Sequence, residues 1–449
     1  MRRSSWIPAA AVALVAAALH LRTLGFEFVF DDLHLIVNNS FLREPLSPLT
    51  AFAHHFWHGT PFGAAYYRPI VTSSLALNGR LLGWGPAGFH LVNILLHAVN
   101  SALLLVLARR LGAPVLAATC AAMLFAVHPV AAWPVGSIVA RVDLLPALFV
   151  LLAWLAFQGG RRPALVGLLF LLALLSKESA IAFLAVPILG LRRMREPGPA
   201  PDGEARTSAG TDRKVLLALA AGVIAWLALR MGIGLGVLIA RHQVGALTNP
   251  LAQLGMPERL WAALALAGRY ILYLVFPARF ADPRNYLDPS TLPSPFNPGV
   301  LLSLGVLVAW GAGIVVLWLR RDRIAIPLAF SLASFLPASN ILVPIGSLYA
   351  QNFLYMPLLG LCVALADLLS RWAARRASPD LQKAPALAPF PALAAFPALA
   401  AFPVLAAVPI LAVLAAVSFV ETGIWRDGVA LFTAWTSRFP YYSMAHSSL

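Results

Sequence analysis

The sequence is poor in charge and in cysteine. Only 11% of its 449 residues are charged, and acids are the scarcer kind, with 18 Asp and Glu against 33 Lys and Arg. Both cysteines, Cys120 and Cys362, lie inside apolar stretches. They therefore indicate neither a disulfide framework nor a thiolate metal site, and they leave the redox compartment open.

Hydrophobic residues take the place of charge. They make up 60% of the chain, and the mean hydropathy of +0.80 is above what a soluble globular protein tolerates. This composition indicates an all-α polytopic membrane protein. The net charge of +15 would suit nucleic acid, but the Arg and Lys residues stand in short groups between apolar runs, as the positive-inside rule expects. We therefore expect membrane lipid, and no nucleic acid, among the partners.

The N-terminus predicts an uncleaved first transmembrane helix. Arg2 and Arg3 precede an apolar run over residues 6–20 that lacks a small-residue cleavage site, which places the N-terminus in the cytoplasm. Arginines recur at alternate connections, at 109–110, 161–162 and 192–195, and assign these to the cytoplasm too. Further spans are predicted at about residues 89–107, 114–127, 144–157, 163–175, 180–191, 215–238, 299–319, 324–336, 353–369 and 396–420.

Other segments are predicted not to cross. The apolar segment 259–277 would, if it crossed, export the arginines at 320–323. Residues 192–214 are rich in Pro, Gly and charge, and residues 377–395 form a Pro/Ala repeat, so both are predicted to be linkers. We therefore expect a bundle of about eleven crossings over residues 1–420, followed by an outward-facing tail at 421–449 that resembles the start of helical repeats.

The acidic pair Asp31-Asp32 is the first candidate site. It follows the first apolar run and opens a long outward-facing loop that extends to about Gly88. Acids beside a hydrophobic span are costly unless they are used, so both are catalytic candidates. The alternatives are an ordinary solvated loop, or Asp32 capping a short helix. A divalent cation at this pair is left open, although no spacing of metal ligands in the sequence supports one.

The predicted topology brings more polar groups to the same side. His128, the Arg141-Asp143 pair and the Lys177-Glu178 pair fall in connections that alternate with the cytoplasmic ones. We therefore expect one outward-facing site. Each group also has a plainer interpretation. Arg141 and Asp143 could form a surface ion pair of little energetic value. Lys177 and Glu178 could end a tight turn, and the histidines could serve helix packing.

Short motifs occur in a fixed order along nearly the whole chain. They are Phe30-Asp31-Asp32 with Asn38, Tyr67-Arg68-Pro69-Ile70, Gly88-Phe89-His90-Leu91-Val92-Asn93 with His97, Phe125-Ala126-Val127-His128-Pro129-Val130, Arg141-Val142-Asp143-Leu144-Leu145, Leu175-Ser176-Lys177-Glu178, Asn249-Pro250, Arg269-Tyr270 and Leu336-Pro337-Ala338-Ser339-Asn340. The ordered set resembles the transmembrane and tetratricopeptide-repeat O-mannosyltransferase family and its bacterial relatives, in the GT-C glycosyltransferase superfamily. The resemblance implies a GT-C-like helical bundle.

The chain departs from the family pattern at several places. Residues 131–135 read Ala-Ala-Trp-Pro-Val where the family usually has His-Thr-Glu-Ala-Val, and residues 350–352 read Ala-Gln-Asn in place of Ala-Glu-Arg. The tetratricopeptide array usual in the family does not follow His446. These departures bear on substrate choice and on activity.

The resemblance implies a reaction. A mannose-like hexose would pass from a polyprenyl-phosphate carrier to a protein hydroxyl on the outer side, with Asp31 as general base. Asp32 would be its electrostatic partner or an acceptor-binding group. Cations are expected to meet the phosphate, for which Arg guanidinium is well suited, namely Arg68, Arg141, Lys177 and Arg269. The full set of substrate-binding candidates is Arg68, His90, His128, Arg141, Asp143, Lys177, Glu178, Arg269 and Asn340.

Other function classes stay open. A transporter or flippase for a lipid-linked or anionic substrate would use the same outward cations, although such proteins commonly contain internal repeats that this sequence does not show. A catalytically impaired scaffold is a further alternative, in view of the departures. The expected location is a bacterial inner membrane, with the site facing the periplasm or the outside.

Overall fold

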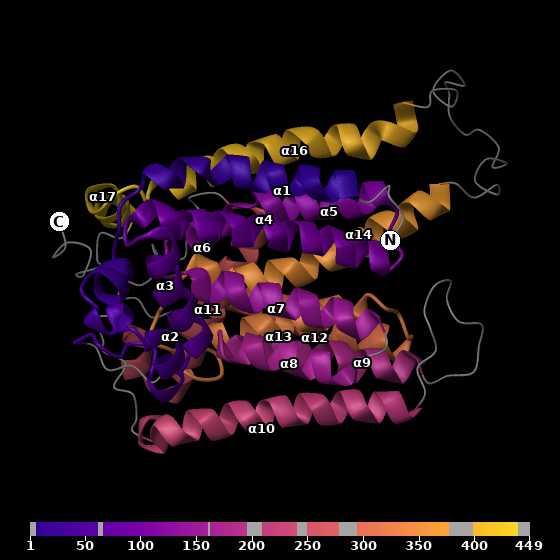
Figure 1. Cartoon of the computed structure of the whole chain (residues 1–449). Coiled ribbons are helices and arrows are strands. Elements are labelled where there is room, and N and C mark those ends of the chain that lie inside the picture. Colours follow the sequence, from indigo (N-terminus) through magenta and orange to yellow (C-terminus); the bar gives the residue numbers. More distant parts are fainter. Residues whose placement is uncertain are drawn as a thin grey trace, which may run out of the picture.

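The computed structural model describes residues 6–61, 66–159, 162–194, 209–239, 249–277, 294–376 and 398–438. Within these ranges every regular element is a helix, and most of the long helices run side by side in one bundle (Figure 1). The helices of this bundle are α1 (Trp6–His20), α4 (Pro86–Arg110), α5 (Val115–Val127), α7 (Arg141–Gln158), α8 (Pro163–Leu174), α9 (Ala185–Met194), α10 (Ala209–Ile239), α11 (Met256–Val275), α12 (Pro298–Leu319), α13 (Ala325–Phe335), α14 (Tyr355–Arg376) and α16 (Ala398–Gly423). This architecture confirms the predicted all-α polytopic membrane protein.

Local sequence signals explain where these helices begin and end. Proline occupies the first turn of α4, α8 and α12, where its missing N–H costs nothing. At the start of α12 the Asn297 side chain also accepts a hydrogen bond from the Gly299 N–H. Arginines end α4 and α14, which suits the negative end of the helix dipole.

Fewer described helices than the predicted crossings are long enough to span a membrane by themselves. Six described helices are long and apolar enough to span a membrane, or up to eight if each bent pair counts as one span. Helices such as α8 and α13 are apolar but short. A 12-residue helix rises only about 18 Å, whereas the hydrocarbon core is about 30 Å thick. The predicted count of about eleven therefore stays a prediction.

The bundle has two distinct ends. At one end, called here the first-loop end, lie the further helices α2 (Ser47–Thr50), α3 (Pro69–Leu82), α6 (Ala132–Gly136) and α17 (Gly428–Arg438). At the other, the N-terminal end, Arg323 donates to the Leu111 carbonyl and Arg110 donates to the Leu155 carbonyl. Figure 1 shows α2, α3 and α17 at the left and the N-terminus at the right.

Helix α11 begins and ends at the first-loop end. Asn249, shortly before it, donates to the Asn340 side chain, and Leu274, in its last turn, accepts a hydrogen bond from His128. Both partners belong to the first-loop end. α11 is also absent from the described helices that meet the criteria for a span. These contacts agree with the prediction that segment 259–277 does not cross.

Helices approach closely where side chains are small. A Cβ added at Gly360 of α14 would lie 2.7 Å from the Pro327 carbonyl of α13. Small residues at such contacts let helix backbones pack tightly. Close packing is important in a membrane, because the hydrophobic effect does not drive helices together there. This close approach holds α13 directly against α14.

Some predicted segments lie outside the described residues. They are residues 195–208 of the predicted linker 192–214, the Pro/Ala linker 377–395, and residues 439–449 of the tail. The predicted division of the chain at residue 420 stays a prediction. The described part of the tail contains α17, which packs against the first loop.

Candidate active site

The acidic pair lies on a tight turn after α1. The chain leaves α1 through a short 3₁₀ segment, Leu21–Gly25, and becomes extended at Phe26. Phe30 then adopts a φ of 54°, a left-handed conformation that is rare and costly for a bulky residue. Directly after it come Asp31 and Asp32. We call residues 26–32 the acidic turn.

Asp32 is a buried anchor rather than a helix cap. Its side chain is 0% exposed and does not cap the short helix that follows. It accepts instead from the backbone N–H groups of Val29, Ile138 and Val139, the last at 2.9 Å. Burial raises its pKa to about 7, against the opposing effect of these hydrogen bonds and of the Arg141 charge. Asp32 thereby ties the acidic turn to the segment before α7.

Asp31 is half-buried and more accessible. Within the described part of the chain, no hydrogen bond or ion pair engages its carboxyl group. Burial and the neighbouring Asp32 charge raise its pKa to about 7. A partly exposed carboxyl group with this pKa, engaged by no described residue, can take up and release a proton near neutral pH.

Arg141 lies in the core beneath the turn. Its side chain is 0% exposed, and its three nitrogens donate to groups of α3 and α4. Nε donates to Asn93 Oδ1 at 2.8 Å, and Nη2 donates to Asn78 Oδ1 at 2.8 Å. The remaining acceptors are the Phe89 carbonyl and the carbonyl and hydroxyl of Ser74. The guanidinium group is therefore saturated by the protein.

A second buried group centres on Asp143. One carboxylate oxygen accepts from Lys177 Nζ at 2.5 Å, and the other accepts from Asn352 Nδ2 at 2.6 Å. The Lys177 ammonium also lies 5.1 Å from the centre of the Phe353 ring. Asn352 is one of the departures from the family pattern, so at this position an amide, and not an arginine, completes the partners of Asp143.

Arg68 and Glu178 form a more open pair. Arg68 Nη2 lies 3.0 Å from Glu178 Oε1, with side-chain exposures of 11% and 31%. The guanidinium group also lies over the rings of Tyr66, at 4.5 Å, and Phe56, at 5.4 Å. Nε and Nη2 both donate to Glu178, whereas Nη1 makes no hydrogen bond to a described residue. Arg68 can therefore still offer a donor to a ligand.

The other predicted residues are placed as follows. His90 is buried below the acidic turn, edge-on to Phe26 at 6.1 Å. His128 Nδ1 accepts from the Val130 N–H, and its Nε2 lies 3.1 Å from the Leu274 carbonyl. Asn340 organises its own loop through hydrogen bonds with residues 345, 347 and 348. Arg269 lies half-buried on α11.

The structure thus brings the predicted groups to one end in two clusters. The Asp32 charge helps to raise the pKa of Asp31, and the Arg141 charge opposes the rise in the pKa of Asp32. The Asp143 charge helps to raise the pKa of Arg68. Arg269 and Asn340 belong to the neighbouring α11 and α13 region. Among the described residues, no group of three or more His, Cys, Asp or Glu is arranged to hold a metal ion.

Sequence reasoning missed several supporting residues. Asn78 and Asn93 hold Arg141, and their signal was an amide inside an otherwise apolar helix, which is costly without a partner. It also missed an aromatic cluster under the acidic turn, in which Trp425 and Trp435 pack on Trp133 with ring centres 4.9 and 6.1 Å away. Trp133 is far from these two tryptophans in the sequence, so no local pattern could indicate the contact.

Comparison with known proteins gives relatives of one kind. The chain is 27% identical over 382 residues to mouse protein O-mannosyl-transferase TMTC3. The aligned part is 79% of this chain and 41% of the relative. It is 29% identical over 425 residues to human TMTC1, covering 81% and 46%. Over a shorter stretch of 190 residues it is 38% identical to the Drosophila protein Tmtc2, covering 38% and 20%.

These relatives support the resemblance drawn from the motifs, and the chain is similar to protein O-mannosyl-transferases. It spans about half the length of the curated relatives it matches. No family model matches it, and no solved structure is significantly similar to it.

Proposed function

We propose that this chain is a membrane glycosyltransferase that moves a mannose-like hexose from a polyprenyl-phosphate carrier to a protein hydroxyl. The observation that carries the proposal is Asp31, a half-buried carboxyl group that no described residue engages, on a turn anchored by Asp32. The named activity of the relatives supports the reaction class.

Asp31 acts as the general base. The acceptor hydroxyl oxygen forms a bond to the anomeric carbon while the bond from that carbon to the phosphate oxygen breaks. The hydroxyl proton passes to Asp31, and the bonding electrons leave with the polyprenyl phosphate. A base works best with a pKa near the working pH, and the pKa of about 7 for Asp31 meets this condition.

Asp32 and Arg141 support Asp31 without touching the substrate. Asp32 is fully buried, so of its two predicted roles we assign it that of electrostatic partner. Its negative charge helps to raise the pKa of Asp31. Arg141 balances that charge from below and holds α3 and α4 against α7.

Arg68 is the cation best placed to meet the phosphate. Lys177 is 7% exposed and paired with Asp143, and Arg141 is saturated. Arg68 keeps Nη1 available, and Arg269 on α11 is a second candidate. A guanidinium group that is already fixed by Glu178 loses little freedom when it binds phosphate, which favours a strong charge-assisted hydrogen bond.

The proposed orientation puts the first-loop end on the outer side, or periplasm, of a bacterial inner membrane. The clustered arginines at the opposite end, Arg109, Arg110, Arg320 and Arg321 among them, follow the positive-inside rule. The carrier and the acceptor protein would then meet outside the cytoplasm.

The test is transfer by the Asp31→Asn variant. The full chain is reconstituted in vesicles with a polyprenyl-phosphate mannose donor and a Ser/Thr-containing acceptor peptide. We expect transfer to fall to background while the variant stays folded. Unchanged transfer would remove Asp31 from the mechanism, and movement of the carrier across the vesicle without transfer would favour a transporter.

A further inference from the structure

A pocket opens at the N-terminal end of the bundle, opposite the acidic turn. It holds about 640 Å³ of empty space, part of it open to the outside, between α4, α7, α9, α13 and α14. Its walls are largely apolar and include Ala108, Leu111, Ile326, Val363 and Ala366. None of these residues belongs to the candidate active site.

One polar group in the wall lacks a partner. Trp154 lines the pocket and is 1% exposed. Its indole N–H makes no hydrogen bond to a described residue. A buried donor left unpaired is costly. An occupant that carries a hydrogen-bond acceptor at this depth would remove that cost.

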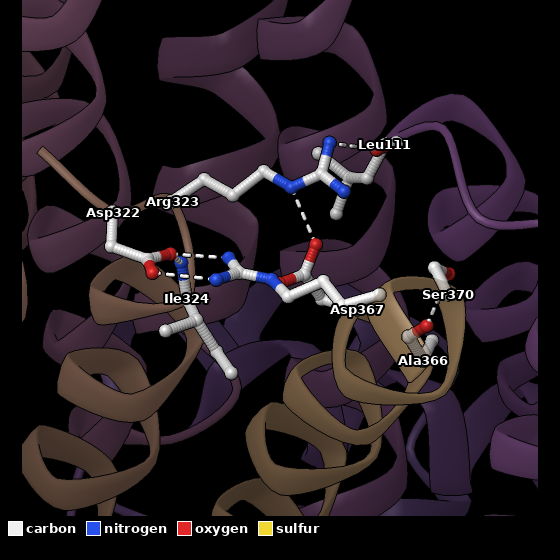
Figure 2. Close-up of polar contacts among 8 residues, drawn as sticks. Leu111, Asp322, Arg323, Ile324, Ala366, Asp367 and Ser370 are labelled. Atoms are coloured by element: carbon white, nitrogen blue, oxygen red, sulfur yellow. Dashed lines mark hydrogen bonds and ion pairs between the residues drawn. The ribbon is translucent and has the colours of Figure 1, made fainter. Parts of the chain in front are cut away.

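The mouth of the pocket carries a fixed arginine. Arg323 donates through Nε to Asp367 and through Nη1 to the Leu111 carbonyl, as Figure 2 shows. Its Nη2 makes no hydrogen bond to a described residue, and its side chain is 34% exposed. Arg323 is therefore held in place with one donor still available.

The acids at the mouth are already neutralised. Arg371 Nε lies 2.6 Å from the second oxygen of Asp367, and its Nη1 lies 2.6 Å from Asp322 Oδ2. Asp322 and Asp367 thus pair with Arg371 and Arg323, and the charges of these residues cancel. The further arginines at this end, Arg109, Arg110, Arg320, Arg321 and Arg375, leave the surroundings positive. This charge suits an anion.

We propose that the pocket binds an anionic phospholipid from the adjacent leaflet. One acyl chain lies against the apolar wall, a carbonyl of its ester accepts from the Trp154 N–H, and the phosphate meets Arg323 Nη2. The chemistry matches at each depth, since apolar side chains face hydrocarbon, indole faces the ester region and arginine faces the headgroup. The proposal does not depend on the sugar-transfer reaction.

The test is photocrosslinking of the full chain in phosphatidylcholine nanodiscs. The probe is phosphatidylglycerol with a photoreactive group on one acyl chain, and the crosslinked peptides are located by mass spectrometry. We expect crosslinks on α7, α13 and α14 next to the pocket. Unlabelled phosphatidylglycerol should compete with the probe, and extra phosphatidylcholine should not.

Matched variants separate the pocket from general lipid contact. Trp154→Phe removes the N–H and keeps the ring, and should reduce labelling at the pocket about fivefold. Trp226→Phe on α10 is the control, because its indole N–H is also unpaired but does not line the pocket. Ala366→Leu fills the space and should abolish labelling there.

Several outcomes would overturn the proposal. These are equal labelling in the parent and in Trp154→Phe, competition by phosphatidylcholine as strong as that by phosphatidylglycerol, or crosslinks spread evenly over the lipid-facing helices. Thermal unfolding checks that each variant is folded. If Ala366→Leu does not fold, the comparison of Trp154→Phe with Trp226→Phe decides the matter.

Discussion

The Trp435 ring lies edge-on to the Phe30 ring, with centroids 5.1 Å apart, and so brings α17 against the residue that precedes Asp31. The backbone joins the same contact, since the Glu27 N–H donates to the Arg426 carbonyl at 2.9 Å. Phe30 has a strained φ of 54°, and such strain persists only where the surroundings enforce it. The tail therefore holds the acidic turn in its observed shape.

Removal of this contact should impair transfer more than folding. In Trp435→Ala, Phe30 loses its packing partner and Asp31 shifts, and a misplacement of about 1 Å can cost up to about 100-fold in rate. We expect a lower kcat in protein that stays folded, together with a lower thermal midpoint, because loss of the buried tryptophan leaves a cavity. The matched control is Trp226→Ala on α10, which should transfer at the parental rate. A Trp435→Ala variant with parental kcat would show that the tail does not position the turn.

Transfer should depend on pH through Asp31. The base must be ionised to accept the hydroxyl proton, and burial together with the Asp32 charge raises its pKa to about 7. The rate should therefore rise as the pH increases through about 7 and level off above it. The measurement is kcat/KM for the donor against pH. A rate that stays constant across this range would contradict the assigned base.

Asp31 should also lower stability at alkaline pH. Its pKa is raised in the folded state from 3.8 to about 7, so the folded protein holds the proton more tightly than the unfolded chain. The contribution of Asp31 to the free energy of unfolding is complete below the unfolded pKa and is lost as the pH rises through about 7.

Asp31→Asn stays neutral, and its thermal midpoint should exceed that of the parent by about 2 °C or more at pH above 8. Near pH 4 the two midpoints should coincide. Equal midpoints at both pH values would mean that Asp31 is not desolvated.

Arg68 and Arg141 should differ in what they support. Loss of a positioned phosphate ligand costs roughly 2 to 4 kcal/mol of transition-state stabilisation, or about 30-fold to 1000-fold in rate. We expect this loss for Arg68→Ala with a smaller fall in the thermal midpoint than for Arg141→Ala, because the Arg68–Glu178 pair is the more exposed of the two groups. Arg141→Ala leaves several buried acceptors unpaired, and loss of one member of a buried charged network costs about 3 to 5 kcal/mol of stability. Kinetics and thermal unfolding of both variants are the measurement, and a loss below about fivefold for folded Arg68→Ala would reject the phosphate role.

Local patterns predicted much of this arrangement. The alternation of arginine clusters predicted which connections lie at the same end of the bundle, and the contacts between Asp32 and Val139 and between Asp143 and Lys177 agree with it. The scarcity of acids drew attention to the acidic turn. Both signals follow from the energetic cost of placing charge near hydrocarbon, and this cost can be judged for each segment by itself.

Long-range packing was beyond prediction. The sequence offers no reason for Trp435 to meet Phe30, because the contact depends on how α17 returns across the bundle. The sequence also suggested Arg141 as a ligand of the phosphate, because its burial depends on Asn78 and Asn93 from other helices. Hydrogen bonding by several distant partners can make a buried arginine tolerable, and this cannot be inferred from spacing alone.

Helix α11 should be accessible from one side at both ends. Glu258, in its first turn, and Phe276, just after its last turn, are exposed. Arg321 is exposed at the opposite end of the bundle, in the turn after α12. In a background without Cys120 and Cys362, the substitutions Glu258→Cys, Phe276→Cys and Arg321→Cys are made one at a time in cells. A membrane-impermeant thiol reagent added outside should label the first two and spare the third until the membrane is opened.

The reason is energetic, because a crossing by α11 would reverse the side of Arg320, Arg321 and Arg323 against the positive-inside bias. Labelling of Glu258→Cys and Phe276→Cys from opposite sides would mean that α11 spans the membrane, and the orientation of every later helix would then be reversed.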